Sequence, residues 1–183
     1  MKRRAILATL LGGLAIAVPV QPAVAGGLEQ LIAPASACPG QSDPGAPLVA
    51  QERAMRCLTD FARQGRGLPG MTASVSLQRA ARHKSADILR CDSFSHEACG
   101  REFTYWMERF GYLGGCASAG ENIAWGTGAL GSVRSIFRAW MRSPGHRENI
   151  LGPFEEIGIG LRLGELEGSS GAHVWTQDFG SKC

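Results

Sequence analysis

Apolar residues recur with helical spacing through the first part of the chain. The earliest such stripe follows the i, i+3, i+4 and i+7 rule and ends at the glycine-rich stretch "GRGLPG", residues 65–70. It consists of Ala54, Cys57, Leu58 and Phe61. This pattern predicts a helix that buries one face.

Three further segments carry the same helical signal. The second stripe consists of Leu77, Ala80, Ala81 and Ile88. Residues 101–112, "REFTYWMERFGY", predict a third helix. The fourth stripe is the clearest and consists of Val133, Ile136, Phe137, Trp140 and Met141.

Strand patterns come late in the chain. Ile157, Ile159, Leu161 and Leu163 alternate with smaller or polar residues, and residues 173–179, "HVWTQDF", are rich in strand-forming types. The glycine-rich, acidic stretch of residues 164–172 between them predicts a hairpin loop. Residues 121–125, "ENIAW", predict one more strand. Helices followed by a late hairpin predict an α+β fold, a small sheet covered by helices.

The first 25 residues carry the features of a secretory signal peptide. Lys2, Arg3 and Arg4 precede an apolar run over residues 5–20, and residues 23–25, "AVA", form a small-residue cleavage site. A membrane anchor fits less well, because glycine and proline interrupt a run that is short for a bilayer span. We expect a secreted chain without a transmembrane anchor, with an extended Pro-, Gly- and Ala-rich lead-in over residues 26–47 and one domain over residues 48–183.

The charge balance gives no support for two classes of partner. Three of the 19 Lys and Arg residues lie in the leader and none of the 16 Asp and Glu residues does, so the two signs balance in the remainder. Nucleic acid and anionic membranes both require a basic face. The sequence therefore gives no reason to expect either partner.

All six cysteines follow the cleavage site, an even number in a chain expected to be exported. Disulfides are the default interpretation, and a zinc–cysteine site is disfavoured because the chain has no C-x-x-C pair. We predict Cys38–Cys57 and Cys91–Cys99, because each closes a short loop. The third pair, Cys116–Cys183, is what remains.

One familiar motif is a poor guide to chemistry. "GTGALG", residues 126–131, matches G-x-G-x-x-G, but the parallel strands of a dinucleotide-binding βαβ unit are missing. A glycine-rich turn into the fourth helix is the better interpretation. H-E-x-x-H and G-x-S-x-G are absent from the sequence.

The four histidines differ in their surroundings. His83 points away from the apolar stripe of its helix and His173 opens the last strand, so a partly exposed position is expected for the first and a surface position for the second. His96 lies inside the predicted Cys91–Cys99 loop, which would hold it still. His146 follows Ser143 and Pro144 as the third residue of a helical turn, a position that needs no function.

Six motifs in a fixed order favour a functional role for His96 and His146. They are "RGLPGM", "FSH", "GENIAWG", "WMRSPGHRENIL", "F-E-E-IGIG" and "VWTQDFG". Together they resemble the CAP superfamily of secreted proteins, which includes cysteine-rich secretory proteins, antigen 5 and plant pathogenesis-related proteins. The resemblance runs from about residue 48 to residue 180 and is greatest to bacterial members with a single SCP domain.

This resemblance implies a three-layer α-β-α sandwich with a cleft that contains two histidines and two acids. By motif these are His96, Glu121 and His146, while Ser143 stands where the family has its second acid. The resemblance further implies that Trp125 belongs to the core and that Asn122 orients the turn. Two imidazoles and one carboxylate resemble a His₂Glu zinc set, with His96 and His146 as metal ligands for zinc or another divalent cation. They also resemble a metal-free acid–base cluster. The missing acid removes one negative charge and weakens both interpretations.

Three functions remain open. The first is an extracellular binding module for a lipid, sterol, peptide or cell-wall component, since family members are reported to bind sterols and lipids. The second is a hydrolase of peptidase type, with Glu121 as base and His96 and His146 holding water or a metal. The third is a purely structural cluster, with function on loops such as residues 164–172. We expect a monomer that is more readily a binding module than an enzyme.

Overall fold

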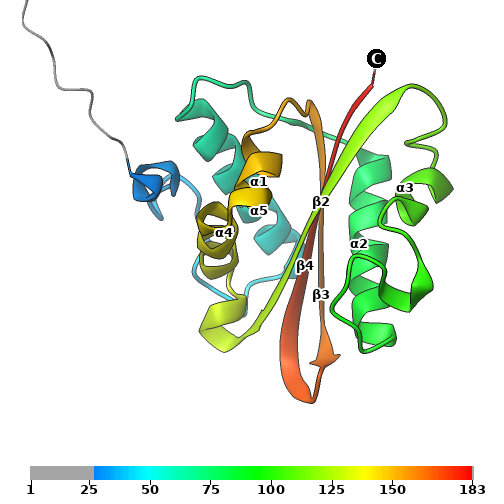
Figure 1. Ribbon diagram of the computed structural model, residues 1–183. Helices are drawn as coiled ribbons and strands as arrows, with labels where there is room; N and C mark the ends of the chain where they lie inside the picture. Colours follow the sequence, from blue (N-terminus) through cyan, green and yellow to red (C-terminus); the bar gives the residue numbers. More distant parts are fainter. Residues whose placement is uncertain (1–26, 183) are drawn as a thin grey trace, which may run out of the picture.

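A four-stranded sheet lies between two layers of helices (Figure 1). The computed structural model describes residues 27–182. The helices are α1 (Leu48–Gln64), α2 (Val75–Arg90), α3 (Tyr105–Arg109), α4 (Val133–Arg142) and α5 (Pro144–Leu151). The strands are β1 (Thr72–Ala73), β2 (Ala117–Thr127), β3 (Glu156–Leu166) and β4 (Ser169–Lys182). Helices α1, α4 and α5 cover one face and α2 and α3 cover the other, which confirms the α-β-α sandwich.

The strand order is β1-β3-β4-β2, with β4 between β3 and β2 and antiparallel to both. Glu167 and Gly168 alone connect β3 to β4, and both have positive φ, at 49° and 74°. Such a pair of residues matches the twist of a two-residue hairpin. The loop predicted over residues 164–172 is therefore wrong, because the ladder continues almost to the turn.

The alternating "IGIG" segment of β3 faces two different layers. Ile157 and Ile159 belong to the main core beneath α1 and α4. A Cβ on Gly158 would lie 2.1 Å from the backbone of Leu77, and one on Gly160 would lie 2.3 Å from that of Ala81. These glycines let α2 lie directly on the sheet, since real Cβ atoms do not approach that closely.

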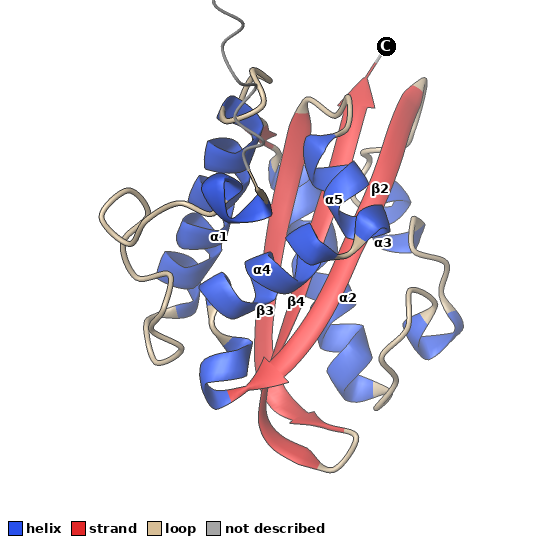
Figure 2. Cartoon of the chain, turned by 60° about the vertical axis from the view of Figure 1, so that its left-hand side comes forward, coloured by secondary structure: helices blue, strands red, loops and turns tan. Residues whose placement is uncertain are grey.

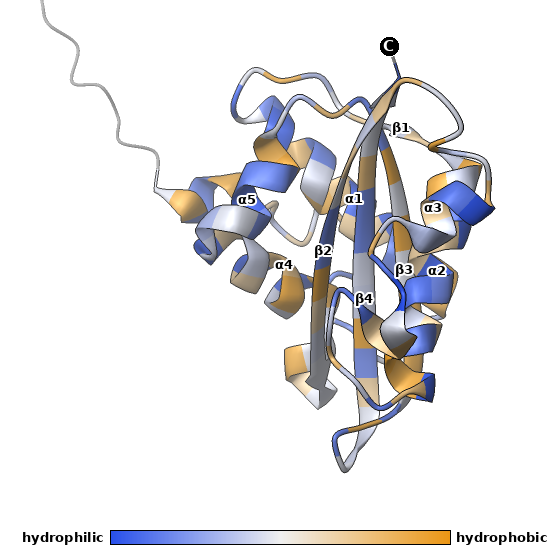
Figure 3. Cartoon of the chain, turned by 45° about the vertical axis from the view of Figure 1, so that its right-hand side comes forward, coloured by the Kyte–Doolittle hydropathy of each residue, from blue (hydrophilic) through white to orange (hydrophobic). Residues whose placement is uncertain are grey.

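The helical stripes predicted from the sequence are confirmed for α2 and α4, where every predicted apolar residue is buried. In α1, Ala54 and Leu58 are buried while Cys57 and Phe61 are partly exposed. Figure 2 shows α4 and α5 crossing one face of the sheet, with α1 along β3. Figure 3 shows that α5 is largely hydrophilic, whereas α4 also carries hydrophobic positions.

The third helix is shorter than predicted. It covers only Tyr105–Arg109 instead of residues 101–112, and Gly111 follows with a φ of 72°. A left-handed residue just after a helix is a common stop signal. "GTGALG" is a turn, as expected, because Gly128–Gly131 form a 3₁₀ helix that leads into α4.

The segment before α1 is more compact than the extended lead-in that its composition suggested. It contains a 3₁₀ helix, Leu28–Leu31, followed by turns, and Leu31 and Ile32 are buried in the main core. The same segment covers His173, whose Nε2 lies 2.9 Å from the carbonyl oxygen of Pro44. His173 is 8% exposed, so the expected surface position is wrong.

Two of the predicted disulfides are confirmed, Cys38–Cys57 and Cys91–Cys99. Cys116 is also disulfide-bonded, but its predicted partner Cys183 lies outside the described residues, so that pair stays a prediction. The predicted signal peptide, residues 1–25, lies outside them as well. Within residues 27–182, no helix combines the length and the apolar character needed to cross a membrane.

Candidate functional site

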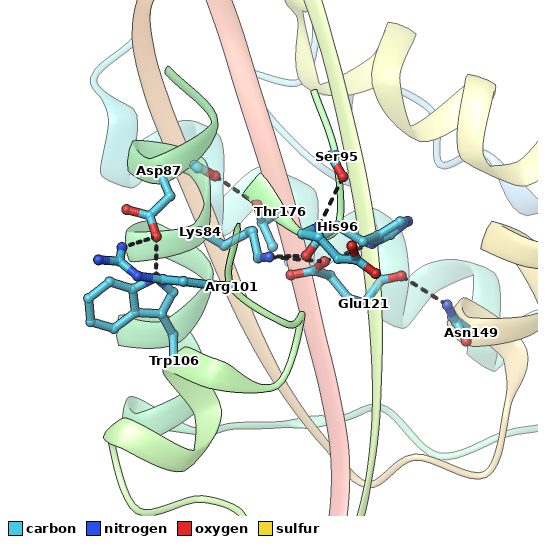
Figure 4. A network of polar contacts seen from close by, with 11 residues as sticks. Lys84, Asp87, Ser95, His96, Arg101, Trp106, Glu121, Asn149 and Thr176 are labelled. Atoms are coloured by element: carbon cyan, nitrogen blue, oxygen red, sulfur yellow. Dashed lines mark hydrogen bonds and ion pairs between the residues drawn. The ribbon is translucent and has the colours of Figure 1, made fainter. Parts of the chain in front are cut away.

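His96 and Glu121 form a contact pair at the β2 edge of the sheet. His96 lies in the loop that the Cys91–Cys99 disulfide closes, and Glu121 lies on β2. The His96 Nδ1 atom is 2.7 Å from Glu121 Oε1 (Figure 4). The imidazole is 51% exposed and the carboxylate only 2%. Glu121 therefore reaches the surface through His96, and it holds that ring in a fixed orientation.

Lys84 joins this pair from the α2 side of the sheet. Its side chain is 2% exposed, its Nζ is 3.9 Å from Glu121 Oε1, and it donates a hydrogen bond to the His96 carbonyl oxygen (Figure 4). A buried ammonium requires a compensating charge, and Glu121 supplies it. Lys84 was not among the site residues predicted from the sequence. The available signal was its position four residues after Ala80 and three after Ala81, on the apolar side of the helix.

A second buried carboxyl, Asp178 on β4, is paired with Glu121 across the β2–β4 ladder. Burial raises the pKa of Asp178 well above its usual range, and the neighbouring Glu121 charge raises it further. Burial also raises the pKa of Glu121, although His96 and Lys84 oppose this change. Glu121 Oε2 and Asp178 Oδ1 each lack a hydrogen-bond partner within residues 27–182. Because the two carboxyls interact, a proton taken up by either of them would relieve their mutual repulsion.

Asp178 was also missed from the sequence, although it stands in the quoted motif "VWTQDFG". Nothing in a strand pattern shows that the residue will meet Glu121, because that meeting depends on the register of β2 against β4. Ser143 cannot supply the second carboxyl, but Asp178 places one beside Glu121. Asp178 is 1% exposed and does not line the cleft.

His146 reaches the site from the opposite helical layer. Ser143 is the N-cap residue of α5 and Pro144 its first residue, as predicted, but the Ser143 side chain makes no capping hydrogen bond. Asn122 Nδ2 donates to the His146 carbonyl oxygen at 3.1 Å, so Asn122 orients this turn, as expected. His146 Nδ1 is buried without a partner in the described part of the chain. Burial lowers the pKa of His146, and the nearby His96 lowers it further.

Two asparagines tie the strand to α5. Asn149 Nδ2 lies 2.9 Å from Asn122 Oδ1 and 3.2 Å from the Glu121 carbonyl oxygen, and Figure 4 shows it on the far side of β2 from Lys84. These contacts fix α5, and with it His146, relative to Glu121. Rigid support of this kind is what a preorganised site requires.

Two adjoining hollows form a cleft over this edge. The polar hollow, of about 580 Å³, is lined by Phe94, Ser95, His96, Glu97, Ile123 and His146. The apolar hollow, of about 280 Å³, shares three of these residues and adds Ala124, Trp125, Ala139, Trp140 and Ser143. Trp125, expected in the core, is only partly buried and lines the cleft wall, whereas Trp140 is core. The structure thus brings His96 and His146 to one cleft, with Glu121 behind it.

The donor set fits a metal only in part. Across residues 27–182, no three or more His, Cys, Asp or Glu side chains come together in a way that could hold an ion. The Glu121 contact to His96 Nδ1 resembles the support that metal-bound imidazoles usually have. A catalytic zinc nevertheless uses three protein ligands, so two imidazoles would need solvent or a bound molecule to complete the set.

The chemistry available without a metal is limited and clear. With Glu121 accepting a hydrogen bond from Nδ1, His96 presents Nε2 to the cleft as an acceptor, or as a donor once the ring is protonated. The two described disulfides and the bonded Cys116 leave no free cysteine among the described residues. The cleft therefore offers hydrogen bonding and proton transfer at His96 beside an apolar wall.

Comparison with known proteins gives one family and several relatives. Residues 49–179 match the family described as "CAP: Cysteine-rich secretory protein family". The uncharacterized protein YkwD of Bacillus subtilis is 36% identical over 152 residues, which cover 80% of this chain and 54% of that protein. The chain thus spans about half the length of this relative.

Solved structures share the fold. An outer surface protein from Borrelia burgdorferi has a TM-score of 0.63 at 14% identity, and the match covers 75% of this chain and 97% of that protein. An extracellular protein containing a SCP domain from Bacillus anthracis has a TM-score of 0.56 at 23% identity, covering 74% and 44%. The order of motifs, the sandwich and the family match agree, and the chain belongs to the CAP family of cysteine-rich secretory proteins.

Proposed function

We propose that this protein is exported and uses its cleft to bind a small extracellular ligand that has an apolar part and a hydrogen-bonding group. One observation carries the proposal: His96, oriented by Glu121, lines the polar hollow, and His146 lines both this hollow and the adjoining apolar hollow beside Trp125 and Trp140. An apolar pocket with a few placed polar groups is the usual form of a small-molecule site. Lipids, sterols, peptides and cell-wall fragments all contain such a combination.

Export is supported by two independent features. Disulfides form and persist mainly in oxidising compartments, and this chain has two within its described residues plus a bonded Cys116. Among the proteins of similar fold, one is named an outer surface protein and another an extracellular protein. Both features agree with the signal peptide expected over residues 1–25.

The test is a binding screen on the oxidised chain that starts at residue 26. Tryptophan fluorescence would follow titration with phosphatidylglycerol vesicles, a cyclodextrin-delivered sterol, a stem peptide and a soluble cell-wall fragment. We expect one probe to bind, with affinity reduced about tenfold or more by His96→Ala, since a lost charge-assisted or buried hydrogen bond is worth about 1.5–3 kcal/mol. His83→Ala is the matched control, because His83 lies on α2 and packs against Trp106, outside the cleft.

Absence of binding by all four probes would count against the proposal. Equal loss of affinity in the His83 and His96 variants would also contradict it, because His96 lines the cleft and His83 does not.

A divalent cation is a second occupant of the same cleft. His96 and His146 would hold it, and when bound it would supply a Lewis acid next to the ligand's polar group. Zinc titration by calorimetry on the wild type and on His96→Ala and His146→Ala tests this. Loss of binding in both variants would support a two-histidine site, while no heat in the folded wild type would refute it.

A hydrolase is the alternative, favoured by one specific feature. The buried Glu121 carboxylate, held against an exposed imidazole, resembles the way a carboxylate orients a histidine base. Because Glu121 itself is buried, the proton acceptor facing a substrate would be His96. Turnover of a peptide substrate that Glu121→Gln abolishes, with an unchanged circular dichroism spectrum, would establish this function. Undiminished turnover in that variant would exclude it.

A further inference from the structure

A second hollow lies at the opposite edge of the sheet from the His96 cleft. Strand β1 pairs only with Glu156 and Ile157 at the start of β3 and leaves the rest of that edge without a neighbouring strand. Helices α1 and α2 flank this edge, and Glu52 of α1 reaches across it to Gln78 and Arg82 of α2. The space that remains beside Ile157–Ile159 is a hollow of about 510 Å³. It is lined by Val49, Glu52, Arg53, Arg56, Ala73, Gln78, Arg82 and Ile157–Ile159. We call it the β3-edge hollow.

The backbone N–H and C=O of Ile159 face this hollow without a partner among the described residues. The Ile157 carbonyl oxygen accepts a hydrogen bond from the Ser74 amide at 3.0 Å, and the Leu161 amide donates to Glu52 Oε1 at 3.3 Å. Alternate residues of a strand direct their backbone groups to the same side, so Ile159 also directs its N–H and C=O away from β4. Neither group has a hydrogen bond to a helix, loop or side chain within residues 27–182.

The charged side chains around this hollow have a positive balance, three arginines against one glutamate. Arg82 is neutralised by Glu52, with Nε 2.9 Å from Oε1. Arg56 is only weakly engaged, since its Nε is 3.9 Å from Asp60 Oδ2 and its side chain is 47% exposed. Arg53 has no ion pair with any described residue. Arg53 and Arg56 therefore leave the β3-edge hollow with uncompensated positive charge.

The chain itself shows what chemistry suits this edge. Glu52 places a carboxylate against the Leu161 amide and pairs with Arg82 at the same time. A ligand with an extended backbone and a carboxylate could make the same two kinds of contact two residues earlier on β3. Its backbone would meet Ile159, and its carboxylate would meet Arg53 or Arg56. Addition of a strand to an open sheet edge is an established mode of peptide binding.

We propose that the β3-edge hollow binds an extended acidic peptide segment as an added strand, with its backbone on Ile159 and its carboxylates on Arg53 and Arg56. A second copy of this chain is a poor occupant, because edge-to-edge pairing would bring the arginines of both copies to one interface. The site lies at the other edge of the sheet from His96 and does not depend on the function proposed for that cleft.

Fluorescence anisotropy with defined peptides tests this. The probe is a fluorescein-labelled, C-terminally amidated hexapeptide that alternates Glu and Val. We expect binding to weaken on the order of tenfold in Arg53→Glu/Arg56→Glu, to be unchanged in Arg66→Glu, which lies outside the hollow, and to be lost when alternate amides of the peptide are N-methylated. In ¹⁵N spectra, the Ile159 amide signal should shift on binding.

Each alternative result overturns the proposal. Equal binding of the N-methylated peptide, or an unmoved Ile159 signal, would show attraction by charge alone. A second copy would show itself as a dimer in sedimentation without peptide. No binding at millimolar peptide would also refute the site, and His96→Ala is expected to leave peptide binding intact, which separates this test from that of the cleft.

Discussion

Replacement of Lys84 by Met tests the buried charge network most directly. The Lys84 side chain is 2% exposed and lies 3.9 Å from Glu121, which shares its surroundings with Asp178. Methionine keeps most of the aliphatic volume, so the substitution removes the charge and the hydrogen bond to the His96 carbonyl while opening only a small cavity.

The magnitude follows from distance and burial. Two unit charges about 4 Å apart interact by about 4 kcal/mol at an effective dielectric constant of about 20. Removal of one partner of a buried pair costs about 3–5 kcal/mol in measured cases. We therefore expect Lys84→Met to lower the free energy of unfolding by about 3–4 kcal/mol near pH 8.

The loss should depend on pH. In the variant, the carboxyl pair of Glu121 and Asp178 can relieve its repulsion by taking up a proton, and the pKa of each carboxyl is already raised by burial. Near pH 5 protonation is easier, so the destabilisation should shrink. Lys84→Met should also lower the free energy of unfolding less in the Glu121→Gln variant than in the wild type, because the charge that pairs with Lys84 is already absent there.

Urea denaturation of the oxidised chain, followed by tryptophan fluorescence at pH 5 and pH 8, measures these quantities. Arg66→Met is the control, because Arg66 is exposed and substitution there should change stability by no more than about 0.5 kcal/mol. A loss below about 1 kcal/mol at both pH values, or an identical loss in the Glu121→Gln background, would refute the charge network.

Four further outcomes follow from the structure. Gly158→Ala should cost about 3 kcal/mol or more in urea denaturation, because its Cβ would lie 2.1 Å from the α2 backbone; a smaller loss would contradict the tight packing of α2. Cys91→Ala/Cys99→Ala should cost about 2.5 kcal/mol for a loop of this length and speed amide exchange around it, and unchanged exchange would argue against the restraint. The raised pKa of Asp178 means that the folded state disfavours its ionised form, so stability is lost as pH rises above the unfolded value of about 3.9. The melting temperature of Asp178→Asn should therefore rise relative to that of the wild type as pH increases, and a difference that stays constant with pH would refute this. The lowered pKa of His146 means that the folded state disfavours the protonated ring, so stability falls as pH drops below the unfolded value of about 6.5. In NMR the His146 ring should titrate below that value, and titration above it would contradict the argument from burial.

Local patterns predicted the parts of the fold that depend on one segment at a time. The apolar stripes of α2 and α4 mark faces that are buried, because side chains three and four residues apart share one side of a helix. The prediction over residues 101–112 was too long, since Gly111 and its left-handed backbone decide where α3 ends. His173 was placed at the surface because nothing local shows that Pro44 covers it.

The sequence likewise predicted some residues of the candidate site and missed others. Motif resemblance identified His96, Glu121 and His146, and the structure places both histidines on one cleft, with Glu121 in contact with His96. Lys84 and Asp178 were missed because each carries an ordinary residue type in an ordinary element. Their importance lies in which buried group they meet, and no spacing within α2 or β4 contains that information.

The sequence by itself determined the family, the helical and strand content, two disulfides and two of the residues that line the cleft, His96 and His146, because these depend on local spacing and on ordered motifs. Only the tertiary structure decided that Glu121 lies behind His96, that Asp178 and Lys84 complete a buried network, and that Ile159 of β3 lines a hollow together with arginines. The physical reason is that burial, pairing and charge compensation are relations between segments far apart in the chain. They exist only once the register of the sheet and the seating of α2 on Gly158 and Gly160 bring those segments together.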